Sequence, residues 1–400
     1  MGSVVTLGLG RLEVDWGKNW NYANHSRLFL PSDGKPVSHY YFDPETEGIA
    51  EELKPGLARS LRSVKRRLEL LGYTLSEARR HFEEDPAHVP DSHENPDVSF
   101  DVFARALAAV DVHRITLDPW FADHSLGDFA ARSILRDPEF TKTAKNLESL
   151  TRYDGTFFEN LDPYVTLRLL AENSANLDVE VQWRYADLVE NGWAEEASIY
   201  EGLSERDRYL IVTEGSSDGA VIRRAMDLLR PDIADFFHFV DMSENYPFTG
   251  AGNLFRFCQG LAQIKIQNKV VVVFDNDAAG MEAERKVKQL QLPSNMRVVR
   301  LPDLPECRLF RTTGPNGSAQ EDINGRAVSI ELFLDLRAGP QSCVRWTSYN
   351  SNTESYQGEL IAKELYAKRF LELKTLPTEY DRSKLELLLD HLYEAIVNAG

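Results

Sequence analysis

The sequence predicts an α/β domain with a Rossmann-like parallel sheet, preceded by an α+β domain and a mostly helical connecting region. From residue 208 onward, apolar strand-like runs alternate with helix-like stretches, which is the pattern of a parallel sheet with covering helices. Residues 1–125 instead mix aromatic, strand-rich segments with helical periodicity. The sequence pattern of residues 126–205 predicts helix over most of their length. We therefore expect an α+β N-terminal domain at 1–125, a helical connector at 126–205 and an α/β domain with a C-terminal extension at 206–400.

Composition narrows the class of protein. The chain has 400 residues, of which 42% are hydrophobic, so two or three domains with real cores are expected. No apolar run reaches the length of a membrane span, and no secretory signal is visible. Its three cysteines are scattered and odd in number, which fits a reducing, cytoplasmic location. The net charge of −18 argues against a basic protein that wraps duplex DNA, although a local basic patch can still steer nucleic acid.

The elements of the N-terminal domain follow from local patterns. Strands are expected at Val4–Leu9, Leu12–Trp16 and His39–Phe42. Leucines and a valine at helical spacing predict helix within residues 55–84, and a further strand is expected at 113–117. In the connector, a helix is expected from Pro163 to Asn173 and a short strand at Val179–Tyr185.

The C-terminal half alternates strands with helices. The expected strands are Tyr209–Thr213, Phe236–Val240, Lys269–Phe274 and Met296–Leu301. The expected helices end at Leu229, Ile264 and Leu290. Each helix follows a strand, so the strands are expected to run parallel.

The segment Val270–Gly280 is the most informative part of the chain. A run of β-branched residues, typical of a strand buried on both faces, ends in Asp275 and Asp277. Side chains two positions apart on a strand share a face, so both carboxylates project from the strand's carboxyl end. Two carboxylates this close repel one another unless a cation lies between them. The pattern therefore predicts a divalent metal site and, with it, phosphate chemistry.

A second acidic strand end is expected at the same edge of the sheet. Glu214 follows the strand Tyr209–Thr213, and Asp218 lies four residues later at the start of a helix. Gly215 would let the backbone approach a phosphate at that helix N-terminus. Carboxylates converging at one edge supply the oxygen ligands that Mg²⁺ or Mn²⁺ prefers.

The two segments YLIVTEGSSDGAVI and VVVVFDNDAAGMEA together resemble the Toprim catalytic domain of topoisomerases, bacterial primases and nucleases of the overcoming-lysogenization-defect type. Glu214, Asp275 and Asp277 match the family's glutamate and Asp-x-Asp motif, and Gly280 matches the glycine of primase-like members. The resemblance implies that Gly215 and Gly280 contribute to cofactor binding. The resemblance covers about residues 206–335. The opening MGSVVTLGLGRLEVDWGKN resembles an N-terminal domain found ahead of HEPN or Toprim domains in prokaryotic conflict systems. No HEPN ribonuclease motif with suitable spacing is present.

The resemblance implies roles for individual residues. Glu214 would act as a general acid/base or metal ligand, and the two aspartates would hold the metal. Asp218 matches an additional acid of nuclease members, and Glu331 in SIELFLD resembles the acid of a later Ile-Glu motif. Lys363 is the candidate for stabilising phosphoryl charge.

Each of these residues also has a structural alternative. An Asp-x-Asp at a strand end can serve as a turn and capping device. Asp218 fits a helix N-cap. Glu331 fits an exposed helix acid, and Lys363 fits the polar face of an amphipathic helix.

The leading hypothesis is a Mg²⁺- or Mn²⁺-dependent Toprim nuclease in prokaryotic antiphage or antiplasmid defence. Its metal ligands would be Glu214, Asp218, Asp275, Asp277 and Glu331. Its substrate would be nucleic acid, and DNA is favoured over RNA. Its partner would be a defence-system protein or a second copy of the chain, and no association with a membrane is expected.

Two other classes remain open. A primase- or topoisomerase-like nucleotidyl transfer enzyme uses the same motif, but the cysteines provide no zinc module and the chain is short for the gate domains of a topoisomerase. A non-catalytic regulator that binds metal or nucleotide in a defence complex suits the acidic balance. A phosphatase with an aspartate nucleophile is more distant, because Ala279 replaces the residue expected two positions after Asp277 and Glu214 would be unexplained.

Overall fold

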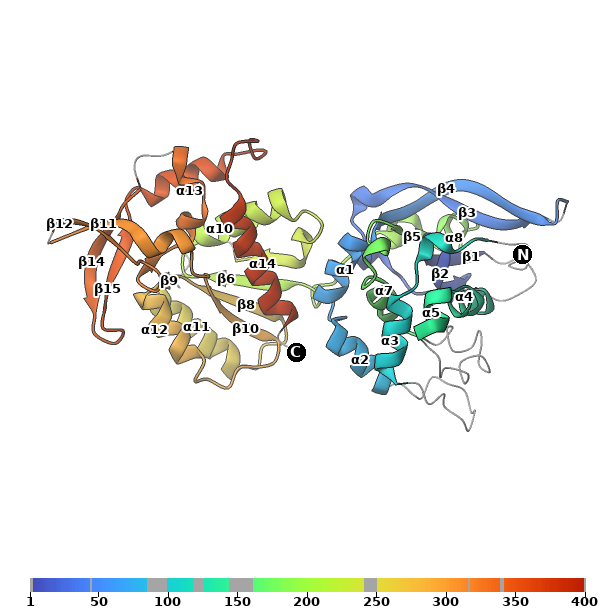
Figure 1. The fold of residues 1–400 in the computed structure, drawn as a ribbon, viewed down its shortest axis with the longest axis horizontal. Coiled ribbons are helices and arrows are strands. Elements are labelled where there is room, and N and C mark those ends of the chain that lie inside the picture. The colour runs from blue at the N-terminus through green and yellow to red at the C-terminus, as the bar shows by residue number, and fades with distance from the viewer. Residues whose placement is uncertain are drawn as a thin grey trace. The chain divides into compact units, whose positions relative to one another are not determined.

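The computed structural model describes residues 3–43, 45–84, 99–117, 126–143, 161–240, 250–315, 317–338 and 342–398. The chain divides into two compact units, Met1–Leu203 and Ser204–Ala399 (Figure 1). No helix among the described residues is long and apolar enough to cross a membrane.

The first unit is built on a five-stranded antiparallel sheet with the order β2-β1-β5-β4-β3. The strands are β1 (Val4–Leu9), β2 (Leu12–Lys18), β3 (Gly34–Asp43), β4 (Gly48–Ser60) and β5 (Glu180–Arg184). The central strand β5 comes from the stretch expected as a connector, and its Trp183 is fully buried. Residues 126–203 thus contribute to the core of this unit, because β5 pairs with both β1 and β4.

Helices accompany the sheet and share its hydrophobic core. They are α1 (Leu61–Leu70), α2 (Leu75–Glu84), α3 (Phe100–Ala108), α4 (Leu126–Leu135), α5 (Pro138–Thr143), α7 (Pro163–Leu170), α8 (Ala186–Glu190) and α9 (Glu196–Ile199). Two local predictions were wrong. Helix begins at Leu61 rather than near residue 55, because β4 continues to Ser60 in register with β5. Residues 112–114 form a 3-10 turn, and no strand follows at 115–117.

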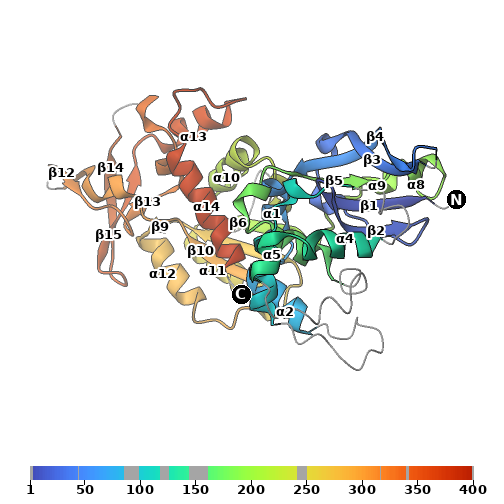
Figure 2. The ribbon, with the colours of Figure 1, turned by 45° about the vertical axis from the view of Figure 1, so that its right-hand side comes forward.

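The second unit contains the expected parallel sheet, with the order β10-β8-β6-β7. Its strands are β6 (Tyr209–Thr213), β7 (Phe237–Phe239), β8 (Lys269–Phe274) and β10 (Met296–Arg300). Helices α11 (Ala251–Gln263) and α12 (Ala278–Val287) pack against Val270, Val272 and Phe274 on one face. Helices α10 (Ser216–Leu229) and α14 (Ser383–Val397) pack together on the other face (Figures 1 and 2). The prediction of mixed α/β structure with a parallel sheet is confirmed.

A second sheet follows the parallel one and was not predicted. Its order is β12-β11-β14-β15. The strands are β11 (Phe310–Gly314), β12 (Gly317–Glu321), β14 (Val344–Asn350) and β15 (Ser355–Leu360). A separate two-stranded pairing joins β9 (Asn276–Asp277), the aspartate segment, to β13 (Ala327–Val328). Helix α13 (Lys363–Leu371) comes directly after β15.

Candidate functional site

The predicted acids lie at the carboxyl ends of two neighbouring parallel strands. Strands β6 and β8 pair through Thr213 and Val273, so the residues that follow them leave the sheet side by side. Glu214 follows β6, and Asp275 lies between β8 and β9. The backbone N–H of Asp275 donates a hydrogen bond to Oε1 of Glu214 at 2.9 Å. The two sequence motifs, 61 residues apart, therefore meet directly.

The second aspartate of the motif caps the helix that follows. Asp277 is the N-cap of α12, and its Oδ1 accepts the N–H of Gly280 at 2.7 Å. The structural alternative of a capping device is thus realised at Asp277. Its other oxygen, Oδ2, accepts a hydrogen bond from the side-chain amide of Gln357.

Gly280 permits the close packing of α12 over the aspartate segment. A Cβ at this position would overlap the carbonyl oxygen of Asp275 and would lie 3.1 Å from Oε1 of Glu214. We expected Gly280 to bind a cofactor. In the structure its described contacts are with the site's own acids, and the missing side chain is what brings Asp275 and Glu214 under the helix.

Asp218 both caps a helix and faces other acids. It lies in the first turn of α10, where its Oδ2 accepts the N–H of Gly215 at 2.8 Å and its Oδ1 accepts from Ser217 at 3.3 Å. Burial raises the pKa of Asp218, and the charge of Glu331 raises it further. Gly215 thus serves the cap of α10.

Glu331 and Lys363 reach the same place from later elements. Glu331 lies on a 3-10 turn at Ile330–Phe333, is only 3% exposed, and accepts a hydrogen bond from Ser329 at 2.6 Å. It is therefore not the exposed acid of the structural alternative. Lys363 is the first residue of α13, and its charge lowers the pKa of both Asp218 and Asp277.

We call Glu214, Asp218, Asp275, Asp277 and Glu331 the carboxylate cluster. Burial raises the pKa of Glu214 to about 8, and the charges of Asp277 and Asp218 contribute. Burial raises the pKa of Asp218 to about 7, with help from Glu331. The pKa of Asp275 lies well above its ordinary value because of burial and of the four other acids. Burial also raises the pKa of Asp277, against hydrogen bonds that lower it. Full ionisation of the cluster would thus place more negative charge at this point than the surroundings compensate.

The donor chemistry of the cluster fits a hard divalent cation. Five carboxyl groups beside one lysine offer oxygen ligands and an unbalanced negative charge. Among the described residues, however, no three His, Cys, Asp or Glu side chains are arranged so that they could hold a metal ion. Glu214, Asp218 and Asp277 each direct an oxygen to a backbone N–H instead. Binding a cation would require some of these side chains to rotate.

Gln357 is a site residue that the sequence did not indicate. It lies on β15, and its side chain donates to Asp277 and accepts the backbone N–H of Ala279 at 3.0 Å. A glutamine on an amphipathic strand 80 residues beyond the aspartate carries no local signal. The packing of β15 against α12 and β13 brings it to the site.

Asn276, between the two aspartates, fixes the motif through the hydrogen bonds of its buried side chain. It is fully buried, and its side-chain amide donates to Oδ1 of Asp303 at 2.7 Å. Its Oδ1 accepts hydrogen bonds from the Arg300 side chain and from the backbone N–H of Gly325. The sequence signal for this role was a polar residue between two acids at the end of an apolar strand. A buried amide at such a position needs hydrogen-bond partners.

Comparison with known proteins identifies the first unit. The family model described as HEPN/Toprim N-terminal domain 1 matches residues 1–207, which is just over half of the chain. The resemblance of the opening residues to such a domain is thereby confirmed. A search of curated proteins found no match, and a search of solved structures found none. The chain belongs to the HEPN/Toprim N-terminal domain 1 family.

Proposed function

We propose that this protein is a Mg²⁺- or Mn²⁺-dependent nuclease whose second unit is a Toprim-type catalytic domain. The observation that carries the proposal is the carboxylate cluster at the carboxyl ends of β6 and β8, with pKa values raised by burial and mutual repulsion. Strongly perturbed acids at the ligand edge of a parallel sheet mark functional sites. The family of the first unit, named for HEPN and Toprim proteins, supports the same class and a role in prokaryotic defence.

The cluster and Lys363 would divide the work of phosphodiester cleavage. Divalent cations, when bound, supply activation of water and stabilisation of the leaving oxygen. Asp275, Asp277 and the three other acids would hold these cations. Glu214, with a pKa near neutrality, would accept or return a proton near the scissile bond. Lys363 would offset charge on the phosphoryl oxygens from the N-terminal end of α13.

The substrate of the proposed nuclease is nucleic acid, and we favour DNA over RNA. Because the chain's net charge is −18, local features and the bound cations would attract the substrate, rather than the surface as a whole. A defence-system protein or a second copy of the chain would associate through the first unit. Under this proposal the first unit senses or docks and the second unit cuts.

Cleavage of supercoiled plasmid DNA tests the proposal. Wild-type protein with Mg²⁺ or Mn²⁺ is expected to nick or linearise the plasmid, and Asp275→Ala is expected to abolish cleavage. Asp390→Ala is the matched control. Asp390 lies on α14, outside the cluster, and forms an ion pair with Arg230. Intact plasmid and intact RNA with both cations would contradict the proposal.

A non-catalytic regulator is the second candidate, because the acids of the cluster already accept hydrogen bonds from the protein itself. Cation binding at Asp275 without turnover of any nucleic acid would favour it over the nuclease.

A further inference from the structure

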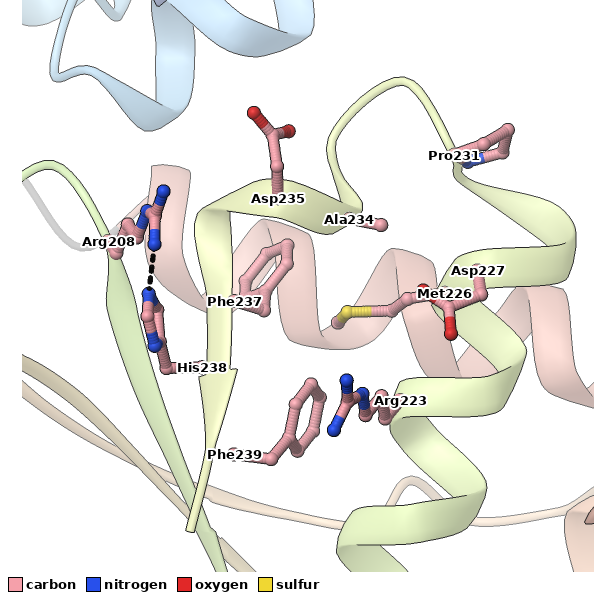
Figure 3. Close-up of a pocket in the computed structure, with 10 residues that line it drawn as sticks. All are labelled: Arg208, Arg223, Met226, Asp227, Pro231, Ala234, Asp235, Phe237, His238 and Phe239. Carbon is pink, nitrogen blue, oxygen red and sulfur yellow. Dashed lines mark hydrogen bonds between the residues drawn. The ribbon is translucent and has the colours of Figure 1, made fainter. Parts of the chain in front are cut away.

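A cavity of about 540 Å³ lies at the edge of the parallel sheet, apart from the carboxylate cluster. It is lined by Arg208, Arg223, Met226, Asp227, Pro231, Ala234, Asp235, Phe237, His238 and Phe239 (Figure 3). We call it the β7 cavity, since it lies between edge strand β7 and helix α10. Its volume is within the range of small-molecule sites in proteins. None of its lining residues belongs to the carboxylate cluster.

The floor of the β7 cavity is apolar and aromatic. Met226 and Phe237 are 4% and 7% exposed, and Phe239 is half-buried. Figure 3 shows the rings of Phe237 and Phe239 on the side of β7 that faces α10, with the Arg223 side chain beside Phe239. A flat ring can stack on such an aromatic surface, because aromatic faces attract other π-systems.

Two arginines line the cavity, Arg208 and Arg223, of which Arg223 is exposed on α10. Arg223 forms no hydrogen bond and no ion pair with any described residue, although Asp227 lies one turn away on α10. The Nη1 of Arg208 donates to Nε2 of His238 at 2.8 Å and to Oε1 of Glu205 at 3.4 Å, while its buried Nε has no hydrogen-bond partner among the described residues. Guanidinium groups in such surroundings favour carboxylate or phosphate oxygens.

The acids of the cavity narrow the ligand further. Asp227 and Asp235 balance the two arginines in number, so a bare polyanion would meet as much repulsion as attraction. A ligand that fits must carry negative oxygens for the arginines and also N–H or O–H donors for the aspartates. It must also present a flat apolar ring to the floor.

We propose that the β7 cavity binds a nucleoside monophosphate. Its phosphate lies at Arg223, its base lies against Phe237 and Phe239, and its amino or ribose hydroxyl groups donate to the aspartates. The same chemistry is presented by a free nucleotide and by the phosphorylated end of a strand. This site stands independently of the nuclease proposal, because it shares no residue with the cluster.

Calorimetric titration of the full chain with AMP, in the presence of a chelator, tests the site. A Kd on the order of 10 µM is expected for a ligand of this size. Arg223→Gln is expected to weaken binding by about tenfold or more through loss of a charged hydrogen bond. Phe239→Leu is expected to weaken it through loss of stacking. Arg285→Gln, an exposed position on α12 outside the cavity, is the control and is expected to bind AMP as wild type does.

Two ligand controls separate the parts of the proposal. Adenosine lacks the phosphate and inorganic phosphate lacks the base, so each is expected to bind far more weakly than AMP. A short DNA strand with a 5′-phosphate, compared with its 5′-hydroxyl form, shows whether a strand end is accepted besides the free nucleotide. Absence of AMP binding, equal binding of adenosine, or unchanged binding in Arg223→Gln would each overturn the proposal. The chelator keeps all these results independent of plasmid cleavage.

Discussion

At the scale of single residues, the candidate site depends on crowding as much as on charge. Glu214 accepts the N–H of Asp275, and α12 closes over both only because position 280 has no side chain. The arrangement of Glu214 and Asp275 therefore depends on a backbone hydrogen bond and on the glycine at position 280, besides the acids themselves.

Replacing this glycine tests the close packing. Gly280→Ala is expected to lower the free energy of unfolding by about 1–3 kcal/mol, because the added Cβ overlaps the Asp275 carbonyl and must displace it. Urea denaturation measures the change. Gly260→Ala is the matched control: Gly260 is inside α11 with no described atom within 4 Å of an added Cβ, so roughly 0.5–1 kcal/mol of stabilisation is expected. Equal effects of the two substitutions would refute the packing argument.

The raised pKa values predict how stability depends on pH. Glu214 shifts from 4.5 to about 8 and Asp218 from 3.8 to about 7 on folding, so between these limits the folded state binds more protons than the unfolded state. The free energy of unfolding of the metal-free protein therefore falls as pH rises through this range. Thermal melts from about pH 6 to about pH 8.5 should show a falling Tm. Asp275→Asn should flatten the fall, and a Tm that rises with pH in wild type would contradict the electrostatic account.

At the scale of elements, the second sheet completes the site. The β14–β15 hairpin is fixed to α12 through Asn350 and Asn352, which both donate to Glu282 at 3.1 and 2.8 Å. From this hairpin Gln357 reaches Asp277 and the N–H of Ala279. The hairpin therefore positions one acid of the cluster and the start of the helix that this acid caps.

Gln357→Ala is expected to reduce metal-dependent cleavage by about 10–100-fold, the usual cost of losing a residue that orients a metal ligand. The fall should be accompanied by weaker Mn²⁺ binding rather than by global unfolding, which circular dichroism checks. Gln320→Ala, on exposed β12 of the same sheet, is the control and should cleave as wild type does. Full activity in Gln357→Ala would show that the hairpin has no positioning role.

The same elements show what sequence can and cannot predict. Strands β6 and β8 were predicted with their observed bounds, because buried parallel strands are continuous apolar runs with polar residues at their ends. The convergence of Glu214 with Asp275 followed from parallel topology alone. Gln357 was missed, and so was the sheet that carries it, because its strands lack the continuous buried apolar runs of β6 and β8. Burial of Glu331 depends on tertiary packing and leaves no trace in SIELFLD.

At the scale of the whole molecule, the two units have separate hydrophobic cores. The core of the first unit is built from residues between Val5 and Ile199, and the described core around the parallel sheet from residues between Val212 and Met296. Units with their own cores can fold alone. Residues 1–203 and 204–400, produced separately, are each expected to melt cooperatively by circular dichroism. A fragment without a cooperative transition would show that its core depends on the other unit.

The central claim is that the carboxylate cluster holds a divalent cation, and calorimetric titration with Mn²⁺ tests it most directly. Because Glu214 and Asp218 are partly protonated near neutral pH, binding must release protons, and the heat must differ between buffers of different ionisation enthalpy. The account predicts Mn²⁺ binding with release of at least about one proton, both lost in Asp275→Asn and both retained in Asp390→Asn. Absence of Mn²⁺ binding, or identical binding by Asp275→Asn, would contradict it.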